Sequence, residues 1–417
     1  LPLHKIQIKN GRAKIFNGSE QIEWAIPSAD VGVEYVDDFL KFNSSFEVLD
    51  EVKSRRSFLK IKTEKSSQPN KFGLMTEITN IPSAYFSNLF PGFLWLEQLE
   101  TNFSAKADIV LSNSGVIDSI DFKILSESGN DLALAAVGSI KIEPEFSGYK
   151  NVPYGIINIQ TRDLDVAELG RYWPPNIAVD ARNWVVNNII YGKVTNLDTK
   201  IIISPNDYIS RTIDKKSVNG SFKFSGLQVN YLEGTAPITN AEGEANFNTK
   251  SLIFDVKDAS FGKSKVKGLV SIFDIDTEDP HMGVEVTTDG ELADITHFLQ
   301  MLQSGGTDES GKNNLLDISN LKGKATTSQS YKFPLLNDLS FKQIEFTGSA
   351  KLSEVELPDV IDSIKLSGGE FDLSVDNNGL RAEGSAYLNA TLANIKWLED
   401  FSDKKDPNNV EKGYLEN

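Results

Sequence analysis

The chain has 417 residues, of which 40% are hydrophobic, so it carries enough apolar material for a buried core and is not a disordered chain. Its 42 lysines and arginines are outnumbered by 59 aspartates and glutamates, which gives a net charge of −17 at pH 7. So acidic a surface repels nucleic-acid phosphates and the anionic face of a bilayer. The absence of cysteine excludes a disulfide framework and thiolate metal sites, and it fits an oxidising compartment such as the periplasm.

Apolar and polar residues alternate along most of the chain, as is typical of β-strands with one buried face. The chain opens in such a strand at residues 3–9. The longest alternation, Leu380–Leu392, predicts a strand of about 13 residues, or roughly 43 Å. Further strands are predicted around Ile120, Phe122 and Ile124, over Leu132–Ile142, around Leu252, Phe254 and Val256, over Ile344–Leu352, and around Phe371, Leu373 and Val375.

The segment Ser221–Tyr231 changes phase in the middle of its alternation. Phe222 and Phe224 occupy even positions, whereas Leu227 and the apolar residues after it occupy odd ones. Gly226 lies between the two sets, so we predict a β-bulge there.

Segments rich in glycine, asparagine and serine predict the turns between strands. They are Asn113–Gly115, Glu127–Gly129, Ser367–Gly369 and Asp376–Gly379. Short helices are predicted at Pro82–Phe90, Asp165–Tyr172, Asp180–Ile190 and Leu292–Leu302. Gly192 is predicted to stop the third helix. The fourth helix is either an amphipathic interaction helix or one that closes an end of the sheet.

This pattern divides the chain into five parts. They are an N-terminal β-sheet segment (1–150), a β-sheet segment with a helical insertion (151–302), a flexible loop (303–314), a C-terminal β-repeat segment (315–401) and a polar tail (402–417). Because the chain begins at Leu1 rather than Met, we interpret it as a fragment of a longer protein.

The helical insertion carries a distinctive motif. Tyr172, Trp173 and Pro174 are followed by a short helix that carries Arg182 and Trp184, and Gly192 precedes the next strand. This region resembles the signature region of AsmA-like proteins, specifically the YhdP branch, most closely over residues 164–273. We expect the motif to be a structural plug that packs the helix onto the sheet edge rather than a contact for a lipid headgroup.

The resemblance implies a fold that is mainly β: a long, twisted antiparallel sheet curled into an open apolar trough, taco-like, with a few short helices. It also implies a bridge-like protein that conducts phospholipids between the inner and outer membranes, with phospholipid acyl chains as ligands and envelope proteins as further partners. Such a protein is periplasmic and is anchored to the inner membrane through a segment outside this stretch. The resemblance implies neither a cofactor nor a nucleic-acid partner.

The residues support the trough by a separate route. Long alternating strands must bury their apolar face against something, and each buried methylene of an acyl chain contributes about 0.8 kcal/mol. The small residues Ala382, Gly384, Ala386 and Ala390 leave room either for lipid or for a closely packed helix or second sheet. We predict acyl contacts at Phe222, Phe224, Leu252, Phe254, Val256, Val270, Ile272, Phe346, Leu373, Leu380 and Leu388. The alternative is a structural or adhesive β-solenoid with a self-closed core and no lipid ligand.

Nothing in the sequence points to an enzyme. The three histidines, His4, His281 and His297, lack metal-ligand spacing, and no nucleophile-elbow motif is present. The acidic segment Asp274–Asp279 resembles a calcium loop only superficially, because Asp279 stands where such a loop needs glycine. We therefore expect no catalytic residue, no cofactor and no metal.

Overall fold

The computed structural model describes residues 5–16, 23–36, 39–50, 55–65, 70–83, 101–112, 114–126, 134–173, 179–210, 217–231, 236–275, 277, 279–295, 320–336, 339, 343–358, 360, 364–401 and 412–416. In this part of the chain, 21 strands join into one antiparallel sheet, accompanied by a few short helices. The first and last strands do not pair with each other, so the sheet is open. The mainly β, open antiparallel fold expected from the sequence is thus confirmed.

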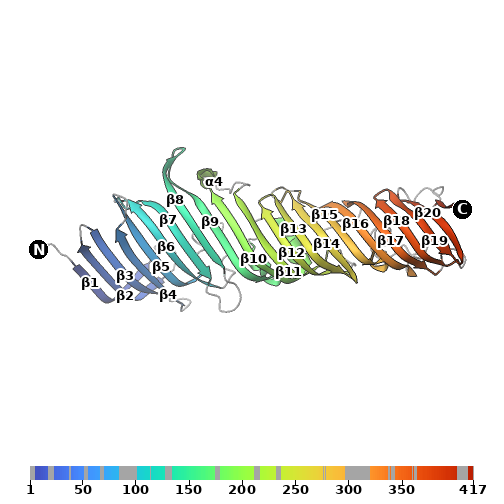
Figure 1. Cartoon of the computed structure of the whole chain (residues 1–417). Helices are drawn as coiled ribbons and strands as arrows, with labels where there is room; N and C mark the ends of the chain where they lie inside the picture. Colours follow the sequence, from blue (N-terminus) through green and yellow to red (C-terminus); the bar gives the residue numbers. More distant parts are fainter. Residues whose placement is uncertain are drawn as a thin grey trace. The chain divides into compact units, whose positions relative to one another are not determined.

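The chain forms two compact units, Leu1–Leu164 with Thr195–Ser221 and Asp165–Val194 with Phe222–Asn417. In unit 1 each of the first nine strands pairs with the next strand along the chain, in a meander (Figure 1). These strands are β1 (Lys5–Phe16), β2 (Glu23–Val36), β3 (Phe39–Asp50), β4 (Arg55–Lys65), β5 (Lys71–Pro82), β6 (Asn102–Ser112), β7 (Ile117–Ser126), β8 (Ala135–Phe146) and β9 (Tyr149–Asp165).

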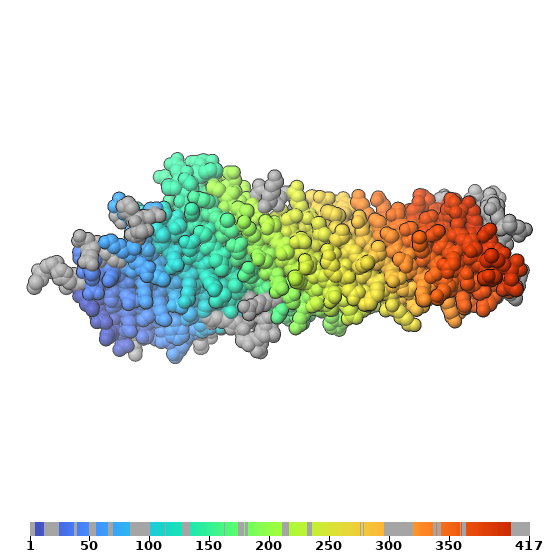
Figure 2. Space-filling model, viewed as in Figure 1, coloured from blue at the N-terminus to red at the C-terminus, as the bar shows by residue number. Residues whose placement is uncertain are grey.

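Unit 2 repeats this meander from β12 to β21, and its strands form bands in sequence order on the surface (Figure 2). Two strands, β10 (Ile189–Ile203) and β11 (Val218–Val229), contribute residues to both units. The others are β12 (Ile238–Asn248), β13 (Ser251–Phe261), β14 (Ser264–Phe273), β15 (His281–Glu291), β16 (Lys322–Pro334), β17 (Glu345–Leu357), β18 (Leu366–Asp376), β19 (Gly379–Leu388), β20 (Thr391–Asp400) and β21 (Lys412–Glu416).

The sheet continues across the predicted loop 303–314, which lies outside the described residues. β15 pairs with β16 without a register shift, from His281 opposite Pro334 to Glu291 opposite Lys324. The sequence alone left open whether residues 315–401 continue the same sheet, and this pairing shows that they do.

The predicted bulge at Gly226 is confirmed. Gly226 has φ of +64°, and Phe224 and Leu227 on either side are both buried although they lie three positions apart. Three asparagines that the sequence did not single out also have positive φ and lie at register shifts. They are Asn10, Asn80 and Asn240. Asparagine tolerates left-handed backbone because its short side chain bonds locally.

The predicted strand Leu380–Leu392 is wrong, because the chain turns at Asn389 and Ala390. Leu388 pairs with Thr391 across this turn, and Asn389 has φ of +53°. The amide of Asn389 donates to the Lys365 carbonyl at 2.8 Å, and its side-chain oxygen accepts from the Lys365 amide at 3.1 Å. A two-residue turn reverses which parity faces the core, so Leu392 points outward and is 62% exposed.

The four turn predictions have different outcomes. The turn at Asp376–Gly379 is confirmed, and Asp376 accepts from the amides of Asn378 and Gly379. Ser367–Gly369 is not a turn, because it lies inside β18, where Gly368 has φ of +59° at a register shift. The positive φ that glycine allows is used there for a β-bulge instead of a hairpin turn. The turn after β6 is present at residues 114–116, and Glu127–Gly129 lies outside the described residues.

The helical insertion forms as predicted over η2 (Val166–Glu168), α2 (Leu169–Tyr172) and α3 (Val179–Asn188). A further helix, α4 (Pro205–Ser210), was not predicted. Residues 292–295 are helical, whereas the rest of Leu292–Leu302 and all but Pro82 and Ser83 of Pro82–Phe90 lie outside the described residues.

Gly192 does not stop the preceding helix, contrary to prediction. That helix ends at Asn188, whose side-chain amide donates to the Trp184 carbonyl, and β10 begins at Ile189. Gly192 lies inside β10 with φ of +117°, where an added Cβ would stand 2.6 Å from Leu227 Cδ2 and 2.8 Å from the Gly226 carbonyl oxygen. Glycine is needed there for close approach of two backbone segments.

The motif around Arg182 is a backbone clamp. The guanidinium of Arg182 donates to the Trp173 carbonyl at 3.0 Å and to the Gly170 carbonyl at 2.7 Å. These bonds hold the end of α2 against α3. Tyr172, Trp173 and Trp184 are half-buried, Val185 is buried, and Pro174 lies outside the described residues.

Gly192→Ala should destabilise unit 2 more than Gly226→Ala does. Both positions have positive φ, which costs an L-residue about 1–2 kcal/mol, but only Gly192 has backbone atoms where the Cβ would go. Urea unfolding followed by circular dichroism measures the difference. Equal midpoints for the two variants would contradict the close approach.

Arg182→Met should lower the free energy of unfolding by about 1–3 kcal/mol, because it keeps the aliphatic stem but removes two charge-assisted hydrogen bonds. Arg171→Met is the matched control on α2, since Arg171 forms an exposed ion pair with Glu168 that is worth about 0–1 kcal/mol. Thermal unfolding of the two variants compares them, and a larger loss in the control would contradict the clamp.

Candidate functional site

In-register pairing collects apolar side chains on one face of unit 1. Leu59 lies opposite Ile78, and Ile124 lies opposite Ala136 in the same cross-strand row. A neighbouring row runs through Phe122. We call these residues the apolar face of unit 1: Leu59, Ile61, Leu74, Ile78, Ile109, Ile120, Phe122, Ile124, Ile140, Ile157 and Ile159.

The apolar face of unit 1 is not a closed core. Every one of its side chains is half-buried, and none is fully buried. The buried hydrophobic residues among the described part of residues 5–164 are Ala25, Ala29, Phe103, Val152 and Leu164, and the register places Ala29 and Phe103 on this same face. Large aliphatic side chains therefore share a face on which they remain partly exposed. Partial exposure of this kind is expected of a surface that receives an apolar ligand.

The opposite face of the same strands carries charges. Lys60, Glu77, Lys106 and Lys123 form one cross-strand row, and the Lys106 ammonium lies 3.0 Å from the Glu77 carboxylate. The hydrogen bond from Lys106 lowers the pKa of the Glu77 carboxyl. Ionised groups in this row prefer water to an apolar interior, so the charged face must be the solvent face.

Unit 2 places the predicted acyl-contact residues on one face of its strands. Leu252 pairs with Ile272 and Phe254 with Val270, and the Phe222 and Phe224 rings lie 6.0 and 5.8 Å from the Phe254 ring. The register carries this face on through Val256, Phe346, Leu373, Leu380 and Leu388. We call it the apolar face of unit 2.

Burial divides these predicted residues into two groups. Phe224, Leu252, Phe254, Ile272 and Phe346 are buried by neighbouring protein, and Ile272 is fully so. The remaining predicted residues are half-buried: Phe222, Val256, Val270, Leu373, Leu380 and Leu388.

Protein covers part of the apolar face of unit 2. Leu292 and Ile295, from the short helix after β15, pack in one cluster with small residues of the sheet such as Ala350 and Ala386. Asp294 fixes this helix, because its carboxylate accepts from the Lys263 amide at 2.9 Å and from the Ser264 hydroxyl at 2.6 Å. Close packing is thus the outcome at Ala386, which is fully buried.

The other small residues of the predicted long strand have different surroundings. At Gly384 the neighbouring strand β18 occupies the space, since an added Cβ would overlap the Glu370 carbonyl oxygen and stand 2.7 Å from the Phe371 Cδ1 atom. Ala382 is half-buried in β19, and Ala390 is exposed in the turn.

The strand β16 interrupts the apolar face of unit 2 with polar side chains. Tyr331 donates from its hydroxyl to the Gln329 side-chain oxygen at 2.5 Å, and the Gln329 amide donates to the Thr327 hydroxyl at 2.7 Å. Burial raises the pKa of the Tyr331 hydroxyl above its usual range, with a smaller contribution from Tyr231. The hydroxyl therefore remains a donor at neutral pH. We call Thr327, Gln329 and Tyr331 the polar ladder.

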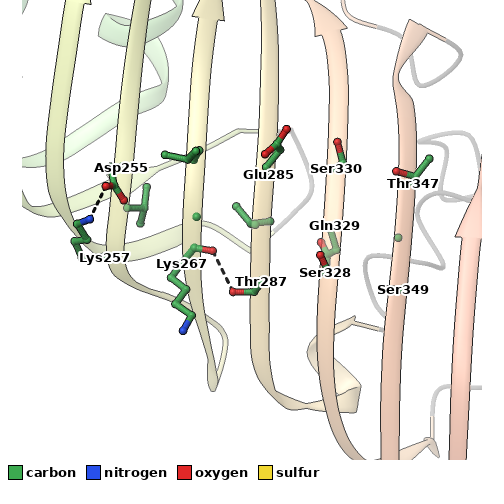
Figure 3. A pocket seen from close by; sticks show the side chains of 15 residues that line it. Asp255, Lys257, Lys267, Glu285, Thr287, Ser328, Gln329, Ser330, Thr347 and Ser349 are labelled. Atoms are coloured by element: carbon green, nitrogen blue, oxygen red, sulfur yellow. Dashed lines mark hydrogen bonds and ion pairs between the residues drawn. The ribbon is translucent and has the colours of Figure 1, made fainter.

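A cavity of about 860 Å³ lies against the middle of β13 to β17 (Figure 3). Its lining includes Asp255, Lys267, Glu285, Ser330 and Thr347, which point away from the apolar face. The large inward neighbours Phe254, Tyr331 and Phe346 do not line it. Most of the lining side chains therefore belong to the polar face, where Asp255 is paired to Lys257. The lining also includes residues at inward positions: Val256, Gly268, Val286, Gln329 and Gly348.

The described residues hold no group of three or more side chains suited to a metal ion. His281 contacts the Asp279 carbonyl at 2.8 Å, beside a turn in which Thr277 donates to Asp274. His4 and His297 lie outside the described residues. Within the described part of the chain, no helix is both long and apolar enough to cross a membrane.

Sequence reasoning placed every predicted lipid contact in unit 2 and missed the more open face of unit 1. The alternation at Ile120, Phe122 and Ile124 was the available signal, and similar alternation runs through β4 and β5. Periodicity cannot distinguish an apolar face that protein covers from one that it does not.

Searches among curated proteins and among solved structures returned no match. The family described as "YhdP protein" matches residues 134–407, which is more than half of the chain. The chain therefore belongs to the YhdP family, a transport-type family of bacterial envelope proteins.

Proposed function

We propose that this chain binds phospholipid acyl chains along its apolar faces and conducts them between the inner and outer membranes. The observation that carries the proposal is the row of half-buried aliphatic side chains on unit 1. An acyl chain on such a face gains about 0.8 kcal/mol per buried methylene without any directional contact. Because successive positions along an apolar row are chemically alike, a chain can slide between them without breaking a specific bond.

The same proposal sets the surroundings of the protein. Family membership supports a periplasmic location, with anchoring to the inner membrane through a segment outside these 417 residues and with envelope proteins as further partners. A net charge of −17 disfavours nucleic acid as a partner. No step requires a catalytic group or a cofactor, since transfer changes no covalent bond.

A structural or adhesive scaffold is the second candidate, and one observation favours it. The cluster around Leu292, Ile295 and Ala386 shows that part of unit 2 closes its apolar face with its own chain. If unit 1 closed in the same way, no lipid would bind. The two candidates therefore differ in what unit 1 holds.

A photoreactive amino acid at position 122 should crosslink to phospholipid, whereas one at position 123 should not. Phe122 belongs to the apolar face of unit 1, and Lys123 points to the charged face one residue later. Protein expressed in bacteria and irradiated in cells can be examined by mass spectrometry for lipid adducts. Equal labelling at the two positions, or none at either, would sink the lipid assignment for unit 1.

Ile124→Lys should reduce the amount of phospholipid that co-purifies with the protein several-fold, because an ammonium group among acyl methylenes must be desolvated. Lys123→Glu is the matched control, since it changes a neighbouring charge on the solvent face. Bound lipid is counted by extraction and mass spectrometry, and circular dichroism verifies that both variants retain the sheet. Wild-type protein that carries no lipid would favour the scaffold.

A further inference from the structure

The polar ladder is unusual for its position. Thr327, Gln329 and Tyr331 occupy alternate positions of β16 and share the apolar face of unit 2 with Val284 and Phe346. Valine or leucine would fill the same places at lower desolvation cost. Folding of the sheet by itself does not call for polar side chains there.

The polar ladder lies on a strand whose backbone is already paired on both sides. β16 pairs with β15 without a register shift, and with β17 continuously from Lys324 to Lys332. The backbone N–H and C=O groups of β16 are therefore hydrogen-bonded to β15 and β17. Among the described residues, the side chain of Gln329 bonds only to Thr327 and Tyr331. The side chain of Gln329 is thus bonded within the polar ladder rather than to a bulge or a strand end.

The ladder keeps an unused hydrogen-bond donor. Gln329 has two amide hydrogens and donates one of them to the Thr327 hydroxyl, which leaves the second without a partner among the described residues. Thr327 itself is buried, so Gln329 is the donor that a ligand can reach. Gln329 is half-buried, so part of its side chain remains exposed. A donor beside an apolar surface gains most from an acceptor that arrives with an apolar ligand.

The uncharged surroundings of the polar ladder favour an uncharged hydrogen-bond acceptor on the ligand. The residues of β13 to β17 that share this face with the polar ladder are apolar, glycine, serine or threonine, and none of them carries a charge. The Asp294 carboxylate, from the helix after β15, accepts from the Ser264 hydroxyl at the far end of β14. A phosphate or a free carboxylate would lie there without a counter-ion, which is costly in an apolar setting. An ester carbonyl is uncharged, accepts hydrogen bonds and is attached directly to an acyl chain.

We propose that the polar ladder binds an ester carbonyl oxygen of a glycerolipid whose acyl chains lie on the apolar face of unit 2. Gln329 donates to the ester through its second amide hydrogen, and Thr327 and Tyr331 orient the Gln329 amide. This inference rests on the proposed lipid function and adds a preferred stopping point, at which the lipid's linkage region rather than its headgroup is recognised.

The test uses vesicles made of equal parts dioleoyl phosphatidylcholine and its diether analogue, which has the same chains and headgroup but no carbonyl oxygens. The 417-residue chain is incubated with the vesicles and re-isolated, and the bound ester-to-ether ratio is read by mass spectrometry. Wild-type protein should enrich the ester roughly two- to tenfold, the size expected of one hydrogen bond. Gln329→Leu with Thr327→Val should bring the ratio close to one while lipid still binds.

Ser330→Ala is the matched control, because Ser330 lies on the same strand but on the polar face. It should leave the enrichment unchanged. A wild-type ratio of one with lipid bound would overturn the ladder assignment alone. Failure of both lipids to bind would overturn the proposed function instead. Enrichment that persists in the double variant would place the ester contact elsewhere and contradict the proposal.

Discussion

The structure depends on one constraint, the in-register antiparallel pairing of strands whose side chains alternate between faces. Once one pair is set, each cross-strand partner places its side chain on the same side as its neighbour. The row through Phe122 and the row through Phe254 both arise in this way. A slip of one residue would carry Lys123 into the apolar face, so the alternation and the register hold each other in place.

Bulges let this constraint extend over so many strands. Gly226 and several asparagines take up a residue each at positive φ, and the register resumes beyond them with the same face apolar. Gly192 shows how tightly the segments approach, since a single methyl would meet the Gly226 carbonyl. These positions are structural, but they decide which side chains are available to a ligand.

The two units use the same pattern to different degrees of closure. In unit 1 most large apolar side chains of the apolar face are half-buried, with Phe103 buried among them, whereas unit 2 buries Ile272 and Phe346 and packs Leu292 onto its small residues. Closure is therefore a local property of what lies over the sheet. The polar ladder on β16 interrupts this apolar face with hydrogen-bonded polar side chains.

The sequence by itself determined the β class, most strands, the bulge at Gly226, the helical insertion and the polarity of each face, because all of these follow from local periodicity and turn chemistry. It did not determine the turn at Asn389, since a two-residue hairpin reverses the inward parity while the apolar letters run on unbroken. Nor did it distinguish Phe122, half-buried, from Ile272, fully buried. Only the tertiary structure decided that, because burial depends on which distant segment, such as the helix at Leu292, comes to lie over a face.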